Sequence, residues 1–382
     1  MNIQYLSKIM KEKYLLEKNT SYQRISDLEV QEVLSGTIIP MERIEIDNTK
    51  SFYISGGVYD ENMELIPLSL NKRVSPPNFY WSYDDWYSGF DKFNLKQNTK
   101  DKTIIFLGAF HPHFAHFILE SMSRFWIFLN DEYLNAECVY ISENEINRDY
   151  FDWIKLFGVN PSRISRLTEK TTYSKVIVPE MSLRLHDYYH PRFKSIIDKI
   201  ILKVPFKPNN KVYYISRKNI GNKRIFGEKS LEYFFKILNI EYLYPETLSA
   251  EELIFKLKSC KKVVAISGTS SHNSLFMSDN SILVCLNRSP HLHPPQSMID
   301  HMKNLKTTYV DVFLFSFLNL DWSSGPFYVY PSKYFMKFIY NDFSFKKPFN
   351  LTTIYCSLFS FFSFIFRSFK IKIALFLARK KN

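Results

Sequence analysis

The chain has 382 residues, a formal net charge of +12 and a pI near 9.2. Hydrophobic residues make up 46% of it and charged residues 23%, a composition that excludes disordered and fibrous proteins. A chain of this length is sufficient for two ordinary domains. The basic charge indicates an anionic partner. Because the sequence has neither a Lys/Arg-rich arm nor an RNA-binding motif, we expect phosphate or membrane partners and no nucleic acid.

The cysteines and the N-terminus bear on the cellular compartment. Four cysteines lie far apart in the sequence, so neither a disulfide framework nor a structural zinc site is expected. The N-terminal residues lack the continuous apolar stretch of a signal peptide. We therefore expect a cytoplasmic protein in a reducing compartment.

In the first half of the chain, the pattern predicts short strands and then an alternation of strands and helices. After a polar, partly helical lead-in over residues 1–30, short alternating strands are expected. The apolar run 102–110 predicts a buried strand, and apolar residues at helical spacing follow it over His116–Leu129. Further elements are a strand over 136–142 and helices over 147–159 and 194–202. The segment 204–210, with two prolines and two asparagines, is the expected domain boundary.

The second half alternates between strands and helices, which predicts βαβ units and a parallel, doubly wound sheet. Ser249 and Glu252 have the spacing of a capping box at the start of one helix. The predicted strands cover residues 211–217, 240–246, 262–267 and 281–287, and the predicted helices cover 228–239, 249–260 and 273–278.

The C-terminal tail differs in character from both halves. Its apolar run Ile354–Phe366 has 13 residues without a charge, fewer than the roughly 20 that span a bilayer. Basic residues then alternate with apolar ones and close the chain. This pattern favours an interfacial helix held by apolar burial and by anionic lipid. A helix packed on the protein core and a true membrane span are the alternatives.

Three histidines cluster after the predicted buried strand, in the segment "HPHFAHFILESMSR". His111 and His113 could place two imidazoles on one side of a strand end, a spacing that suits zinc or iron. A third ligand could come from His116 or from the "HLHPP" segment at residues 291–295. The competing interpretation is a pair of loop histidines that make ordinary hydrogen bonds.

His116, Glu120 and Arg124 follow one another at helical intervals and are expected along one face of the helix. A histidine beside a carboxylate is a candidate general base, because the carboxylate orients the ring and stabilises its charged form. A purely structural network of the same three residues is the alternative.

Two further segments favour an anion. Ser216 and Arg217 end a predicted strand, where doubly wound sheets bind ligands, and the basic residues Lys218, Lys223 and Arg224 follow. Arginine pairs with phosphate through a bidentate fork, although a solvated basic loop would have the same composition.

The second of these segments, "VVAISGTSSHNSLF", carries a predicted strand into Gly268 and then into a helix. The backbone N–H groups at such a helix start favour anions, and the hydroxyls of Thr269, Ser270 and Ser271 could donate further hydrogen bonds. Together the two segments predict a diphosphate between them.

In order and spacing, these segments resemble glycosyltransferase family 61, whose bacterial members are commonly called capsular polysaccharide biosynthesis proteins. The resemblance spans about residues 100–290. The sequence departs from the family pattern at Phe117, at Gly227 and at the small residues after Gly268. The positions that match the family motifs are His116, Glu120, Arg124, Ser216, Arg217, Arg224, Gly268, Asn273 and Phe276.

The resemblance implies an α/β protein of GT-B type, with two Rossmann-like, doubly wound domains that face each other across a cleft. It also implies inverting transfer from a nucleotide-sugar donor without an obligatory metal or other cofactor. Residues 1–205 would form the acceptor-side domain, residues 206–345 the nucleotide-sugar-binding domain, and residues 346–382 an amphipathic, basic, membrane-associating tail.

In this interpretation, His116 is the catalytic base and Glu120 orients it, with Asp187 as the second candidate for the base. His113 and Arg124 are further candidates beside them. The donor-binding residues would be Ser216, Arg217, Arg224, Gly268, Thr269, Ser270, Ser271 and Asn273.

The expected protein is a peripheral enzyme on the inner face of the cytoplasmic membrane that builds a capsule, an O-antigen or another surface glycan in bacteria. The aromatic residues of 78–90 could stack on sugar rings or pack in a core. Two other functions stay open at this point: a histidine-ligated metal hydrolase that acts on a glycan or phosphate ester, and a non-catalytic scaffold that binds glycan or lipid.

Overall fold

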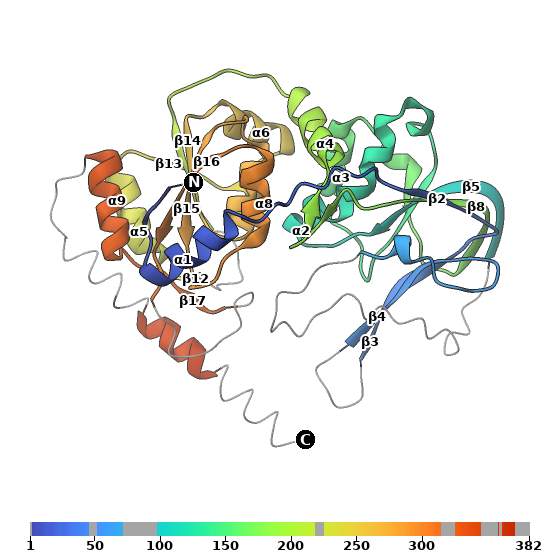
Figure 1. The fold of residues 1–382 in the computed structure, drawn as a ribbon, viewed down its shortest axis with the longest axis horizontal. Coiled ribbons are helices and arrows are strands. Elements are labelled where there is room, and N and C mark those ends of the chain that lie inside the picture. The colour runs from blue at the N-terminus through green and yellow to red at the C-terminus, as the bar shows by residue number, and fades with distance from the viewer. Residues whose placement is uncertain are drawn as a thin grey trace. The chain divides into compact units, whose positions relative to one another are not determined.

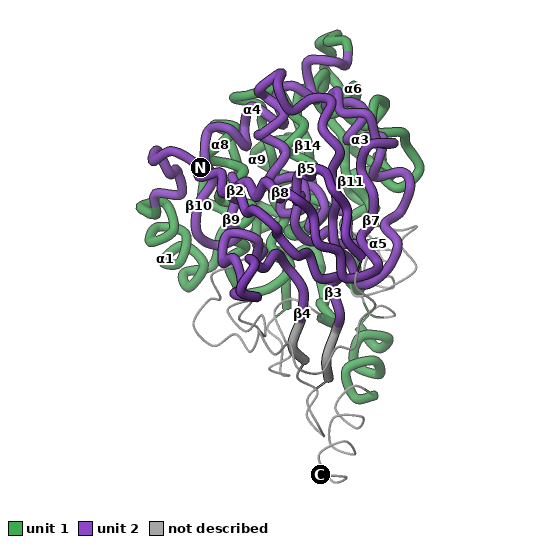
Figure 2. The backbone as a smooth tube through the Cα atoms, turned by 90° about the vertical axis from the view of Figure 1, so that its right-hand side faces the viewer, with its two compact units in different colours: residues 1–20, 205–382 green, residues 21–204 purple. Residues whose placement is uncertain are grey.

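The structure, a computed structural model, describes residues 2–45, 52–71, 98–217, 225–314, 325–344, 358 and 361–370. Its contacts divide the chain into two compact units, which Figure 2 shows in different colours. We call Ser21–Val204 the N unit, and Met1–Thr20 together with Pro205–Asn382 the C unit. The expected first domain, 1–205, therefore differs from the N unit at its start, because the first residues of the chain lie with the C unit.

The C unit contains a parallel sheet that has six strands among the described residues. Its order is β1-β16-β15-β14-β11-β13. The strand bounds are β1 Asn2–Tyr5, β11 Val212–Ile215, β13 Glu241–Leu243, β14 Lys262–Ile266, β15 Ile282–Asn287 and β16 Lys306–Asp311. All five neighbouring pairs are parallel. The predicted parallel sheet of the second half is thus confirmed, and β1 extends it beyond β16.

Helices cover both faces of this sheet (Figure 1). They are α1 Lys8–Glu17, α5 Glu228–Ile237, α6 Ala250–Ser259, α7 Thr269–His272, α8 Pro294–Met302 and α9 Lys333–Phe343. In Figure 1, α5 and α9 lie on one side of the strands, and α6 and α8 lie on the other. The capping box predicted for Ser249 and Glu252 is present at the start of α6.

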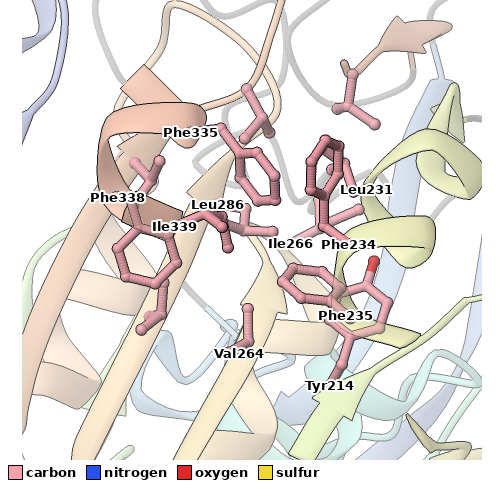
Figure 3. Close-up of a cluster of buried hydrophobic side chains, with 14 of the residues drawn as sticks. Tyr214, Leu231, Phe234, Phe235, Val264, Ile266, Leu286, Phe335, Phe338 and Ile339 are labelled. Carbon is pink, nitrogen blue, oxygen red and sulfur yellow. The ribbon is translucent and has the colours of Figure 1, made fainter. Parts of the chain in front are cut away.

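The core between the sheet, α5 and α9 follows from the two periodicities of strand and helix. Val264 and Ile266 alternate along β14 and point to the same face, while Leu231, Phe234 and Phe235 form one stripe of α5. Figure 3 shows these side chains in contact with residues of α9 and of the neighbouring strands. All of them are almost completely buried.

The N unit has a mixed sheet of seven strands among the described residues. The strands are β2 Val30–Leu34, β3 Thr37–Glu45, β4 Phe52–Tyr59, β5 Asn98–Ala109, β6 Cys138–Ile141, β7 Ile164–Arg166 and β8 Thr171–Pro179. The order β7-β6-β5-β8 is parallel, whereas β2, β3 and β4 join in antiparallel pairs. We expected this unit to be a second doubly wound domain. Only β5, β6, β7 and β8 are parallel, because β2 and β3 pair with β8 in the antiparallel direction.

The helical region after β5 also differs from expectation. The single helix predicted over His116–Leu129 is an α-helix, α2 Phe114–Leu119, followed by a 3₁₀ helix, η4 Ser121–Leu129. Serine hydroxyls contribute to the change, since Ser121 Oγ donates to Ala109 O and Ser123 Oγ donates to Glu120 O. The other helices of this unit are α3 Tyr150–Phe157 and α4 Pro191–Leu202.

The described part of the tail is helical over residues 361–370. It packs near a short parallel pair in the C unit, β12 Ile225–Phe226 and β17 Phe327–Tyr328. Within the described residues, we find no helix with the length and apolar content needed to cross a bilayer.

Candidate functional site

In the N unit, the candidate site is built at the carboxyl end of β5. The chain leaves this strand at Ala109 and enters α2 at Phe114, so that His116 lies in the first turns of the helix. His116 Nδ1 lies 2.5 Å from Glu120 Oε2, and the Glu120 side chain is fully buried, while 37% of the His116 side chain is exposed. A carboxylate accepts hydrogen bonds, which places the proton on Nδ1 and leaves Nε2 as the basic nitrogen.

The two other histidines of the cluster surround this pair. The rings of His111 and His113 lie 5.6 and 5.2 Å from the His116 ring. His113 is the residue before the first turn of α2, and the backbone N–H of His111 is held by Ser121 Oγ. Over the part of the chain that the structure describes, no group of three or more His, Cys, Asp or Glu side chains is arranged to hold a metal ion.

Arg124 does not share the face of His116 and Glu120. A 3₁₀ helix turns by about 120° per residue and an α-helix by about 100°, so the change at Ser121 rotates the residues beyond it. The Arg124 side chain is completely buried and donates to the carbonyl oxygens of Leu70 and Pro179. Burial lowers the pKa of Arg124 to about 10, and the group stays charged near neutral pH. We therefore assign it to the architecture of the unit.

Asp187 lies in the turn between two short strands, β9 Leu183–Arg184 and β10 Tyr188–Tyr189. Its carboxylate is 3.4 Å from Arg184 Nη1 and 37% exposed. The hairpin is attached to η4, because the Ser182 N–H donates to Ser123 O. Asp187 therefore lies in a hairpin that is bonded to η4 through Ser182, and its charged neighbour is the Arg184 guanidinium.

In the C unit, the candidate donor residues lie where the strand order of the sheet reverses. The chain forms β11, then β13 on one side of it, and then β14 on the other side. In doubly wound sheets, ligands bind outside the carboxyl ends of the strands at this reversal. Ile215 of β11 pairs with Ala265 of β14, so the next residues of both strands lead side by side into the two predicted phosphate segments.

The residues after β11 are held by two glutamates of α5. Ser216 is buried, and its Oγ donates to Glu232 Oε1 at 2.8 Å. Glu228 Oε1 accepts the N–H of Arg217 at 3.0 Å and the hydroxyl of Tyr214 at 2.7 Å. Burial raises the pKa of Glu228. These bonds fix the backbone from which the Arg217 side chain starts, whereas Lys218, Lys223 and Arg224 lie outside the described residues.

The residues after β14 form a compact turn. Ser271 Oγ donates to Gly268 O and accepts the Gly268 N–H, while Asn273 Nδ2 donates to the carbonyl oxygens of Thr269 and Ser270. Ser270, Ser271 and Asn273 are buried. Their side chains therefore build the turn, and Thr269 is the more exposed of the predicted hydroxyl residues.

Arg288, which we did not predict, is the next residue after β15. Its guanidinium carbon lies 4.3 Å from the centre of the Phe327 ring, and the backbone N–H of Arg288 donates to Ser267 Oγ. Gly268 has a φ of +113°, and a Cβ there would come within 2.8 Å of Arg288 Nη1. The positive φ favours glycine at this position whatever the surrounding space. The sequence carries the same signal for Arg288 as for Arg217, namely an arginine at the end of a buried strand of a parallel sheet.

Comparison with known proteins finds one family model that matches part of the chain. The family model described as Glycosyltransferase 61 matches residues 114–284, from α2 in the N unit to β15 in the C unit. The match includes His116, Glu120, Arg217 and Gly268, and it ends before Arg288. A search of the curated proteins found no match. Residues 114–284 of the chain are therefore similar to glycosyltransferase family 61.

Proposed function

We propose that the protein is an inverting glycosyltransferase that moves a sugar from a nucleotide-sugar donor to a hydroxyl of a growing surface glycan. The observation that carries this proposal is the pair of arginines, Arg217 and Arg288, beside the reversal in strand order of the C unit. The proposal includes the GT-B organisation that the family resemblance implies, with the donor on the C unit and the base on the N unit.

The donor half of the proposal rests on charge. Arg217 follows β11, Arg288 follows β15, and the Gly268 turn follows β14, which lies between these strands in the sheet. Arginine forms paired, charge-assisted hydrogen bonds with phosphate oxygens. Stacking on Phe327 limits the motion of the Arg288 side chain. We propose that these groups bind the diphosphate and stabilise the charge that it gains as it leaves, so that a metal ion is not obligatory.

The base half rests on the His116–Glu120 pair. In the proposed step, His116 Nε2 removes the proton from the acceptor hydroxyl while the oxygen attacks the anomeric carbon. The bond from this carbon to the diphosphate breaks, and the nucleotide diphosphate leaves with the electron pair. Glu120 stays ionised and stabilises the imidazolium that forms. Attack on the face opposite the leaving group inverts the anomeric configuration.

The acceptor that we propose is a bacterial capsule, an O-antigen or a related surface glycan. This part of the proposal rests on the resemblance to capsular polysaccharide biosynthesis proteins. It also agrees with the net charge of +12, since such acceptors are assembled on anionic carriers or membranes.

A thermal-shift screen against UDP, GDP, CDP and CMP, each with and without EDTA, tests the donor half. A ligand that binds only the folded protein raises the melting temperature by mass action. We expect one nucleotide to raise it, with the same shift in EDTA. A shift that needs a divalent metal, or no shift with any nucleotide, would contradict the proposal.

Two variants locate the nucleotide. Arg217→Ala and Arg288→Ala should each weaken binding of the nucleotide diphosphate by about tenfold or more, because each removes a charge-assisted hydrogen bond. Lys236→Ala, which removes an exposed charge from α5, is the matched control and should leave binding unchanged. Wild-type affinity in both arginine variants would show that the diphosphate binds elsewhere.

A further inference from the structure

The helix at residues 361–370 is attached to the C unit by one of its edges. The ring centre of Phe364 lies 5.6 Å from that of Tyr328 and 6.1 Å from that of Phe226, and the Phe361 ring lies 5.4 Å from the Tyr328 ring. Phe364 is only 6% exposed, and Ser368, one helical turn further along, is fully buried. The β12–β17 pair thus holds this helix along the Phe361, Phe364 and Ser368 edge.

Another face of the same helix carries large aromatic side chains into solvent. Phe362 is 67% exposed, Phe366 is 64% exposed and Phe369 is 59% exposed. They are spaced by four and then three residues, which places them in one stripe of an α-helix. A stripe of exposed phenylalanines is costly in water, since each buries a large apolar area when it is covered.

Positive charge lies beside this stripe. Arg367 and Lys370 are exposed on the same helix, and Lys370 Nζ lies 4.8 Å from the centre of the Phe366 ring. The sequence from residue 344 to the end contains eight Lys or Arg residues and no Asp or Glu. A surface that covers this face must therefore be apolar beneath and anionic above.

We propose that the helix at 361–370 docks the C unit on an anionic phospholipid bilayer, with Phe362, Phe366 and Phe369 inserted among the acyl chains. Arg367 and Lys370 then lie at the level of the lipid phosphates. The combination of three exposed phenylalanines and flanking cations is the pattern of an interfacial helix. A nucleic acid offers negative charge but no apolar layer to cover the three phenylalanines. A protein groove would have to supply both an apolar surface and negative charge. The proposal is independent of the glycosyl transfer, since it uses none of the donor or base residues.

Co-sedimentation of the full-length protein with vesicles tests this docking. The vesicles contain phosphatidylcholine, alone or with about 30% phosphatidylglycerol. We expect the protein to sediment with the anionic vesicles, at least about tenfold more tightly than with neutral ones, and to be released by salt. A protein that stays in the supernatant with anionic vesicles would overturn the proposal.

Matched variants separate the two contributions. The triple variant Phe362→Ser/Phe366→Ser/Phe369→Ser should weaken vesicle binding at least about tenfold. Arg367→Gln/Lys370→Gln should weaken it about fivefold for each charge removed and should reduce its salt dependence. The control Leu16→Ser/Leu202→Ser changes side chains that are 74% and 78% exposed and should bind as the wild type does.

Three results would overturn the proposal in distinguishable ways. Wild-type vesicle binding by the triple serine variant would show that the stripe does not insert. A dimer in solution that the triple variant abolishes, without any vesicle binding, would assign the face to a second copy of the chain. Binding to RNA but not to vesicles would assign the charge to nucleic acid. A cooperative thermal unfolding transition like that of the wild type verifies that each variant is folded.

Discussion

At the scale of single residues, the Glu120 carboxylate is fully buried and contacts an imidazole that water can reach. The backbone N–H of Glu120 donates to His116 O, so one turn of α2 brings both side chains together. An i,i+4 pair of this kind can be predicted from spacing alone. The position of Arg124 could not be predicted in this way, because its partners Leu70 and Pro179 are more than fifty positions away in the sequence.

Gly108 gives a first prediction at this scale. It has a φ of +82°, and a Cβ there would lie 2.6 Å from Arg124 Nε and 2.7 Å from Asn71 Oδ1. Gly108→Ala should therefore lower the free energy of unfolding by about 3 kcal/mol, as the sum of backbone strain and displacement of the buried arginine. Urea denaturation measures this change.

Gly158→Ala is the matched control for Gly108→Ala. Gly158 also has a positive φ, +102°, but a Cβ there would meet only Lys199 Cε at 3.9 Å. The control should lose only the strain contribution, about 1 kcal/mol. Equal losses in the two variants would show that Arg124 does not need the space beside Gly108.

Asp300 gives a prediction about pH. Burial raises the pKa of this carboxyl to about 6, although Tyr309 and Gln296 donate hydrogen bonds to it. The folded protein then binds the proton more tightly than the unfolded chain does, so stability is highest below pH ~4 and falls as the pH rises through ~6. Asp300→Asn should remove this dependence, which corresponds to about 3 kcal/mol.

Urea denaturation of wild type and Asp300→Asn between pH 4 and pH 7 measures this difference. As the pH rises, the free energy of unfolding of Asp300→Asn should increase relative to that of the wild type. Asp149→Asn, the same change at an exposed position, should follow the wild type. A constant difference between wild type and Asp300→Asn across the range would contradict the raised pKa.

At the scale of secondary-structure elements, the strands and helices of residues 211–287 could be predicted because each has a clear period and a clear boundary. Ser249 caps α6 as its spacing with Glu252 predicts. The mixed sheet of the N unit was harder to predict, since the antiparallel pairing of β2 and β3 with β8 joins segments that are distant in the sequence. The end of α2 at Leu119 depends on hydroxyl contacts that periodicity does not contain.

The N-terminal segment was missed for the same reason. Nothing local in "NIQY" shows that β1 pairs with β16, three hundred residues later. The segment is fixed by specific bonds: the Ser7 N–H donates to Asp311 Oδ2 at 2.7 Å, and the hydroxyl of Tyr14 donates to Asn287 Oδ1 at 3.0 Å. These bonds make α1 part of the C unit.

Tyr14 therefore tests the docking of α1. It is 2% exposed, and its ring lies 4.2 Å from the ring of Tyr309. Tyr14→Ala should lower the free energy of unfolding of the C unit by about 3 kcal/mol or more, because it leaves a cavity and removes the hydrogen bond to Asn287. Leu16→Ala, on the same helix but 74% exposed, should change it by less than about 0.5 kcal/mol. If denaturation experiments gave similar free-energy losses for Tyr14→Ala and Leu16→Ala, α1 would not be packed against the C unit.

At the scale of the whole molecule, the family match covers part of the N unit and part of the C unit. The sequence motifs predict roles for His116, Glu120, Arg217 and Gly268, and these roles stay predictions. Arg288 was missed, because its relation to Gly268 exists only once β14 and β15 pair. Arg224 and the aromatic segment 78–90 lie outside the described residues, and their roles stay predictions.

The central claim is that His116 is the base of a glycosyl transfer whose donor binds beside Arg217 and Arg288. The most direct measurement is release of nucleotide diphosphate from a panel of nucleotide sugars, with a lipid-linked glycan fraction as acceptor, by wild type and by His116→Ala. We expect the variant to lose at least about 100-fold in kcat, because the acceptor hydroxyl keeps its proton, while its affinity for the nucleotide is unchanged. Near-normal turnover by His116→Ala would contradict the account.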